Sequence, residues 1–206
     1  MDITKAKLDL LDMTLPAAIA LDFGGARHTA YAEHCAARGT PVTIVDGNIP
    51  RVPIAPSITV VRGNFADAGF LRGAVKPAEL GIMYDILLHQ YGPLDTLRLM
   101  LAYASDAVCI GQPCLSPARS SPEESMVFLP AVPLHRQADL VPRFQDGIYG
   151  DKGFFQPDAY TCAQWLWGIP PALLRCWVER EGWTIAAERT VPYSPGWVWW
   201  GCYATR

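Results

Sequence analysis

The chain has little charge, no run of like charge and no apolar stretch long enough to cross a bilayer. Charged residues make up 18% of the 206, and the formal net charge is −3. No block of lysines and arginines stands out, so a large nucleic-acid interface or a polybasic membrane contact is unsupported. A membrane-spanning helix needs about 20 consecutive apolar residues, and the N-terminus lacks the layout of a secretory signal. We therefore expect a cytoplasmic protein without a membrane partner.

Paired metal ligands are also missing. The six cysteines include no C-x-x-C pair, and no histidine accompanies Cys109 and Cys114, the only two that lie close together. Because zinc sites use closely spaced cysteine or histidine pairs, we predict no metal. Several cysteines fall inside apolar stretches, and we interpret them as reduced core thiols.

The dinucleotide fingerprint G-x-G-x-x-G is absent. Ala26 stands at its second glycine, and no further glycine occurs before Gly39. The chain also lacks a Tyr-x-x-x-Lys pattern or a similar hydride-transfer constellation. Both absences argue against a nicotinamide-dependent oxidoreductase of the doubly wound type, which stays open as an alternative.

Apolar strands and helical stretches alternate along the chain. Half of the residues are hydrophobic, and the length suits one sizeable domain over residues 1–206. We predict strands at 19–22, 42–45, 58–61, 80–86 and 107–110, a leading helix within 2–12, helices at 93–103 and 170–182, and closing strands at 184–187 and 197–203. The alternation predicts an α/β fold: a doubly wound, mainly parallel sheet with helices on both faces and an antiparallel closing pair at one edge.

Residues 111–157 break this alternation. They carry prolines without a long periodic run, and a loop of that length is generally functional or disordered. Because the segment leaves the carboxyl end of the strand at 107–110, it should lie over the crevice where open α/β sheets bind ligands. We predict a lid or substrate-recognition insert.

A glycine turn follows the first strand. This strand ends in Asp22 and runs into Gly24 and Gly25, where the missing side chains let the backbone turn sharply and approach a ligand. Asp46 ends the next strand, roughly twenty residues later, where doubly wound folds place the carboxylate that binds ribose hydroxyls. The plain alternative is a tight turn that binds nothing.

From about residue 18 to residue 203, the chain resembles the class I S-adenosylmethionine-dependent methyltransferases. Ala20-Leu-Asp-Phe-Gly-Gly-Ala is similar to their first motif, under the methionine part of the cofactor, and Val45-Asp46 to their ribose-binding acid. Arg62-Gly-Asn-Phe-Ala-Asp is similar to the third-strand motif beside the adenine. The resemblance implies S-adenosyl-L-methionine as the cofactor and methyl transfer to a small-molecule acceptor. It implies these cofactor-binding residues: Asp22, Gly24, Gly25, Ala26, Asp46, Gly47, Asn64, Phe65 and Tyr84.

The stretch from Met83 to Leu94 points to one branch of the family. Leu87-Leu-His followed by Pro93-Leu looks like the corresponding stretch in the branch that contains tRNA wobble-uridine carboxymethyltransferases. Since no basic surface supports a tRNA substrate, we carry over the fold and the methyl donor but not that substrate.

Three residues depart from the family pattern. Ala26 and His28 stand where the second and third glycines are usual, and Asn64 replaces an aspartate. An asparagine keeps a carbonyl acceptor for the adenine amine but loses the charge. The departures leave a second function open, a non-catalytic module that keeps the fold for binding or scaffolding.

His89 is the best candidate for a general base. It follows the fourth strand at the expected crevice, and an imidazole titrates in the right range. A structural role in capping the loop is equally open. His135, Trp165 and Trp167 lie in or after the insert and are candidates for acceptor binding. We expect His34 to be solvated, on the outer side of its helix.

Overall fold

The structure is a computed structural model and describes residues 2–47, 53–116, 125–128 and 167–206. The strands are β1 Ala20–Phe23, β2 Val42–Asp46, β3 Ile58–Arg62, β4 Ala78–Tyr84, β5 Ala104–Leu115, β6 Val127–Phe128, β7 Trp167–Gly168, β8 Thr184–Ser194 and β9 Trp197–Thr205. The helices are α1 Ile3–Asp12, α2 Ala30–Ala37, α3 Ala68–Ala74, α4 Pro93–Leu101 and α6 Pro171–Arg180, with the 3₁₀ turns η1 Gly25–Arg27 and η2 Leu87–His89.

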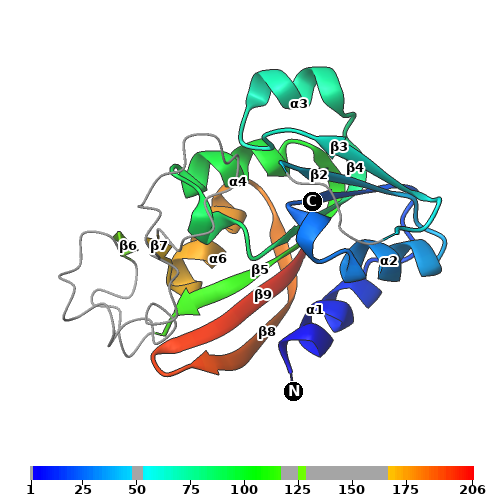
Figure 1. The fold of residues 1–206 in the computed structure, drawn as a ribbon. Helices are drawn as coiled ribbons and strands as arrows, with labels where there is room; N and C mark the ends of the chain where they lie inside the picture. Colours follow the sequence, from blue (N-terminus) through cyan, green and yellow to red (C-terminus); the bar gives the residue numbers. More distant parts are fainter. Residues whose placement is uncertain (1, 48–52, 117–124, 129–166) are drawn as a thin grey trace, which may run out of the picture.

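A seven-stranded sheet forms the centre of the molecule, in the order β3-β2-β1-β4-β5-β9-β8 (Figure 1). The first five strands in the chain pair in parallel. β9 runs antiparallel to both of its neighbours, β5 and β8. The predicted doubly wound sheet with an antiparallel closing strand is confirmed.

Local sequence signals start and stop the helices. Asp2 caps α1, because its carboxylate accepts a hydrogen bond from the Lys5 backbone N–H at 2.7 Å. Pro93 opens α4, where its missing N–H costs no hydrogen bond. Gly39 and Gly182 follow α2 and α6 with φ of +83° and +84°, a left-handed conformation that suits glycine. None of the helices in the described ranges is long and apolar enough to cross a membrane.

Helices cover both faces of the sheet and bury two apolar clusters (Figure 1). α1 and α2 pack on one face through Leu10, Leu11 and Cys35. α3, α4 and α6 pack on the other face, where Leu97 and Leu174 are fully buried. Successive strand residues alternate between the two clusters, as the pleat requires.

β5 is longer than the sequence predicted, so the start of irregular chain at Gly111 is wrong by several residues. β4 pairs with β5 only as far as Gly111, and β9 continues the pairing to Leu115. A proline is tolerated where one edge of a strand has no partner, which explains Pro113. The rest of the insert lies outside the described residues, apart from 125–128.

Two other boundaries also differ from the prediction. The fourth strand ends at Tyr84, and Leu87–His89 forms the turn η2 instead of a continued strand. β8 runs to Ser194, well past Ala187, because pairing with β9 continues through a register shift.

Most of the described cysteines are buried, as expected of core thiols. Cys35, Cys109, Cys114 and Cys202 are buried, and burial raises the pKa of the Cys35 thiol to about 12. Cys176 is the exception, because it is exposed on α6. Cys162 lies outside the described residues.

Candidate functional site

The turn after β1 leaves no room for side chains. Gly24 has a φ of +79°, and its N–H donates to the Val45 carbonyl at 2.8 Å. A Cβ on Gly24 would lie 2.5 Å from Ile86 Cγ2, and one on Gly25 would lie 2.1 Å from Asp22 Oδ2. The backbone of the turn therefore passes directly against the Asp22 carboxylate, and glycine is required at both positions.

Two carboxylates are buried beneath this turn. Asp22 and Asp46 are each 2% exposed. Asp46 Oδ2 accepts a hydrogen bond from the Ala26 N–H at 3.0 Å, whereas Asp22 Oδ2 has no hydrogen-bond partner among the described residues. Burial, and then the charge of Asp46, raise the pKa of the Asp22 carboxyl to about 7, while Lys7 opposes the rise. A ligand that brings a hydrogen-bond donor, and above all a cationic one, would satisfy this carboxylate.

The end of β2 is joined to the end of β3. The Gly63 N–H donates to the Asp46 carbonyl at 2.9 Å, and Arg62 Nε donates to the Gly47 carbonyl at 3.2 Å. Asp46 and Gly47 therefore lie at the carboxyl edge of the sheet, one strand away from the glycine turn.

The third-strand motif reaches the same edge. Asn64 Oδ1 accepts from the Ala66 N–H at 2.9 Å and closes a local turn. An amide oxygen has a second lone pair, so this bond does not exclude a ligand. Phe65 is buried edge-on to Phe23, and its ring lies 3.6 Å from the place of a Cβ on Gly24. The structure thus brings Asp46 and the third-strand motif close to the glycine turn.

Tyr84 is directed to the other face of the sheet. Its hydroxyl donates to the Lys7 carbonyl at 2.9 Å, and its ring packs edge-on to Tyr31 and Trp199. It belongs to the α1–α2 cluster, whereas Phe65 and Ile86, which flank Gly24, belong to the opposite one. A role for Tyr84 in cofactor binding stays a prediction.

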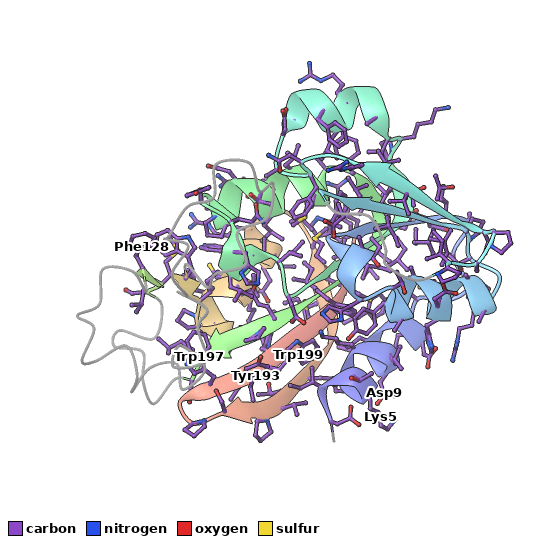
Figure 2. The ribbon with its side chains drawn as sticks, in the orientation of Figure 1. Lys5, Asp9, Phe128, Tyr193, Trp197 and Trp199 are labelled. Carbon is purple, nitrogen blue, oxygen red and sulfur yellow. The ribbon has the colours of Figure 1, made fainter. Side chains whose placement is uncertain are left out.

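The structure places Trp167 beside the turn that carries His89. His89 is half-buried at the end of η2, and its N–H donates to the Ile86 carbonyl at 3.1 Å. Trp167 Nε1 donates to the Gln90 carbonyl at 2.9 Å, and the Phe128 ring lies 4.9 Å from the Trp167 ring. Figure 2 shows Phe128 at this end of the molecule. His135 and Trp165 lie outside the described residues.

The two remaining histidines differ in exposure. His28 is exposed directly after η1. The prediction that His34 is solvated is wrong, because its Nε2 lies 2.8 Å from Asp12 Oδ1 and its side chain is only 15% exposed. Asp12 also accepts from Arg38, so His34 takes part in joining α1 to α2.

The sequence reasoning missed the cluster of Lys7, Asp85 and Trp199, in which a buried lysine pairs with a partly exposed aspartate that also accepts from the Trp199 indole. A signal was present for Lys7. It precedes Leu10 and Leu11 by three and four positions, so it lies on the buried face of its helix. Asp85 belongs to the fourth-strand motif, but nothing local identified its partners.

Neither a protein-family profile nor a curated protein sequence matches the chain. Solved structures do match its fold. A 1,6-didemethyltoxoflavin-N1-methyltransferase from Burkholderia thailandensis, solved with S-adenosylhomocysteine, is 13% identical with a TM-score of 0.63, over 98% of this chain and 76% of that one. The magnesium protoporphyrin IX methyltransferase from Synechocystis PCC 6803, solved with S-adenosylmethionine, is 12% identical with a TM-score of 0.58, over 98% and 77%.

A third match is a putative sarcosine dimethylglycine methyltransferase from Galdieria sulphuraria, 14% identical with a TM-score of 0.61, over 98% of this chain and 84% of that one. At these identities the likeness establishes the fold, which is that of class I methyltransferases.

Proposed function

We propose that the chain is an S-adenosylmethionine-dependent methyltransferase that acts on a small-molecule acceptor. The observation that carries the proposal is the buried Asp22 carboxylate, whose Oδ2 has no partner among the described residues and lies against the glycine turn at the end of β1. This fold binds its ligand at that edge of the sheet. The methionine end of the cofactor carries cationic groups. Its binding would therefore place a positive charge beside the buried Asp22 carboxylate.

The residues at the edge fit the parts of this cofactor. Asp22 would bind the ammonium group, and the backbone at Gly24 and Gly25 would lie under the methionine part. Asp46 would accept from the ribose hydroxyls, and Asn64 would meet the adenine amine. Ala26 donates its N–H to Asp46, so its side chain does not prevent the turn from closing on the acid.

When bound, the cofactor supplies an electrophilic methyl group on a sulfonium. The protein's part is to hold the acceptor in line with that group and to exclude water. His89 takes the proton from a hydroxyl or amine acceptor. Trp167 and Phe128, whose rings are tilted by 49° to each other, supply an apolar surface next to its turn. His135 and Trp165 stay candidates for the same side of the site.

The acceptor is proposed to be small. Two of the matching structures belong to enzymes named for toxoflavin and porphyrin substrates. The likeness of the η2 region to the tRNA-modifying branch stays a prediction, as does the cytoplasmic location.

Calorimetric titration of the purified chain with S-adenosylmethionine, S-adenosylhomocysteine and NAD tests the proposal. We expect micromolar binding of the first two and none of NAD. Lack of all binding favours the non-catalytic module, and binding of NAD alone favours the oxidoreductase.

Two variants of Asp46 sharpen the assignment. Asp46→Ala removes the bond to the Ala26 N–H together with the charge, whereas Asp46→Asn keeps an oxygen acceptor for that bond. We expect Asp46→Ala to weaken cofactor binding at least tenfold, which is about 1.4 kcal/mol. Unchanged affinity in Asp46→Ala would contradict the ribose assignment, and a loss in both variants shows that one amide oxygen does not replace the carboxylate.

A further inference from the structure

Lys7 carries a positive charge into the interior of the molecule. Its side chain is only 5% exposed, on the face of α1 that packs against the sheet. Its Nζ lies 5.0 Å from the ring centre of Tyr31, 5.4 Å from that of Tyr84 and 5.8 Å from that of Trp199. Figure 2 shows Trp199 on β9. Three ring faces therefore surround the ammonium group, an arrangement that stabilises a cation.

Asp85 is the counter-ion of this lysine. Its Oδ2 accepts from Lys7 Nζ, and its Oδ1 accepts from Trp199 Nε1 at 3.1 Å. The Asp85 side chain is 38% exposed, against 5% for Lys7. The Lys7 ammonium is thus buried, whereas the Asp85 carboxylate that it pairs with is partly open to solvent.

The backbone at Asp85 is held in an uncommon conformation. Its φ is +58°, in the left-handed region that non-glycine residues seldom adopt. Its N–H donates to the Gly111 carbonyl at 2.8 Å, which ties it to β5. Such conformations persist where the surroundings impose them, and they cluster at functional sites.

Asp85 lies on the methionine side of the proposed cofactor site. It directly follows β4, and the next residue, Ile86, packs on Gly24. In the strand order β3-β2-β1-β4, the proposed adenosine contacts are at β2 and β3, so the rest of the cofactor extends over β1 towards β4. The charge of Lys7 reaches this region, because it opposes the rise of the Asp22 pKa.

We propose that Asp85 recognises the positive charge of the sulfonium, so that the site distinguishes the charged methyl donor from the neutral thioether left after transfer. Lys7 and Trp199 are positioning residues that hold the carboxylate towards the ligand. The inference rests on the proposed function and assigns it a residue that selects substrate over product. A carboxylate fixed before binding needs little reorganisation when the cation arrives.

Two variants that both lack the ion pair test the role of the charge. Lys7→Met fills the ring cage with an apolar chain and keeps the Asp85 carboxylate. The double variant Lys7→Met/Asp85→Asn differs from it only in the charge of residue 85. Asp85→Asn alone is a poor probe, because it leaves the buried Lys7 without its counter-ion and destabilises the fold. Asp95→Asn, at an exposed acid on α4, is the matched control.

The readout is the ratio of the dissociation constants for S-adenosylmethionine and S-adenosylhomocysteine, measured by calorimetry at one pH and salt concentration. We expect the double variant to bind S-adenosylmethionine about tenfold more weakly than Lys7→Met, with binding of S-adenosylhomocysteine within about twofold. Asp95→Asn should leave both constants unchanged. A merely structural role for Asp85 would weaken both ligands alike.

Equal losses for the two ligands, or no loss for either, would overturn the inference while leaving the proposed function intact. Failure of the unaltered chain to bind either ligand would overturn the proposed function itself. Thermal unfolding of each variant identifies any that no longer folds.

Discussion

At the scale of single residues, the site depends on charges that the fold keeps out of water. Asp22 and Asp46 are both buried; Asp46 Oδ2 accepts from the Ala26 N–H, whereas Asp22 Oδ2 has no donor among the residues that the structure describes. Asp22 therefore resists ionisation, and the unbound protein holds it near its titration midpoint at neutral pH. This state costs stability above the pKa of the unfolded chain, and a cationic ligand relieves it.

The first prediction concerns the pH dependence that follows from Asp22. Its pKa rises in the folded chain from an ordinary value near 3.8 to about 7. Between these values the folded state binds more protons than the unfolded state. The contribution of Asp22 to the free energy of unfolding therefore falls as the pH rises from about 4 to 7, and it levels off above 7. Urea unfolding at a series of pH values measures this slope, and Asp22→Asn should remove it. A slope that persists in Asp22→Asn belongs to other groups.

The same shift predicts that cofactor binding releases a proton. A cation beside Asp22 favours the ionised carboxylate, so affinity for S-adenosylmethionine should rise from pH 6 to pH 8. Titrations in two buffers of different ionisation enthalpy measure the proton count. Lys7 and Asp46 also act on Asp22, so the test needs Asp22→Asn alongside, in which the release should vanish.

Gly25 offers a test of the close approach between the glycine turn and the Asp22 carboxylate, because the substitution changes only the size of the side chain. A methyl group there would lie 2.1 Å from the Asp22 carboxylate, so Gly25→Ala should displace that carboxylate and weaken cofactor binding at least tenfold. Gly73→Ala is the matched control, because, apart from the neighbouring backbone of α3, no atom of the described residues lies within 4 Å of its added Cβ. The control should leave binding unchanged and raise stability slightly. Equal cofactor affinities in both variants would contradict a cofactor site at the Gly25 turn.

At the scale of elements, the antiparallel strand β9 supports the carboxyl edge from behind. Gly111 of β5 and Gly201 of β9 are register partners, and the Trp199 ring lies against both. The glycines make space for this ring, and the ring donates to Asp85. β9 therefore closes the sheet and also positions Asp85 next to the proposed cofactor site.

We predict that Gly201→Ala destabilises the fold. Its Cβ would lie 2.3 Å from the Trp199 ring and 2.9 Å from the Ile110 carbonyl oxygen, so the backbone has to move. Overpacking of this kind costs about 1–3 kcal/mol, which lowers the melting temperature by roughly 2–12 °C at this chain length. Thermal unfolding beside Gly73→Ala measures the difference. A melting temperature equal to that of the control would show that β9 accommodates the methyl group.

At the scale of the whole molecule, the ligand edge is shared by parts that are distant in sequence. β1 and β2 carry Asp22 and Asp46, and Asp85, which follows β4, is held by Lys7 of α1 and Trp199 of β9. A ligand that bridges these parts stabilises only the folded chain. Binding should therefore raise global stability and not only order the turn.

We predict that S-adenosylhomocysteine at one hundred times its dissociation constant stabilises the fold by about 2.7 kcal/mol. The corresponding rise in melting temperature is roughly 5–11 °C for a chain of this length. Differential scanning calorimetry with NAD as the control measures it. A shift of the same size with NAD would argue against a site specific for the methyl donor.

Most of the helices and strands and the glycine turn could be predicted from the sequence alone. Strand and helix periodicity, Pro93 at a helix start and the Gly24–Gly25 pair act over a few neighbouring positions, so they can be read locally. Asp46 and the sheet class followed from the same signals and from a family resemblance, and the structure bears out the sheet. Boundaries such as the end of β5 could not be predicted from the sequence, because pairing with β9 extends this strand beyond its apolar stretch.

Contacts between distant side chains became visible only in the folded structure. Lys7 and Asp85 lie 78 positions apart, and Trp199 lies 114 positions beyond Asp85. Whether a buried lysine lies beside a carboxylate depends on strand order and helix packing. Neither can be inferred from the residues next to the lysine in the sequence. The same holds for Asp22 Oδ2, which has no partner within the described part of the chain, because burial is a property of the assembled fold and not of any one segment.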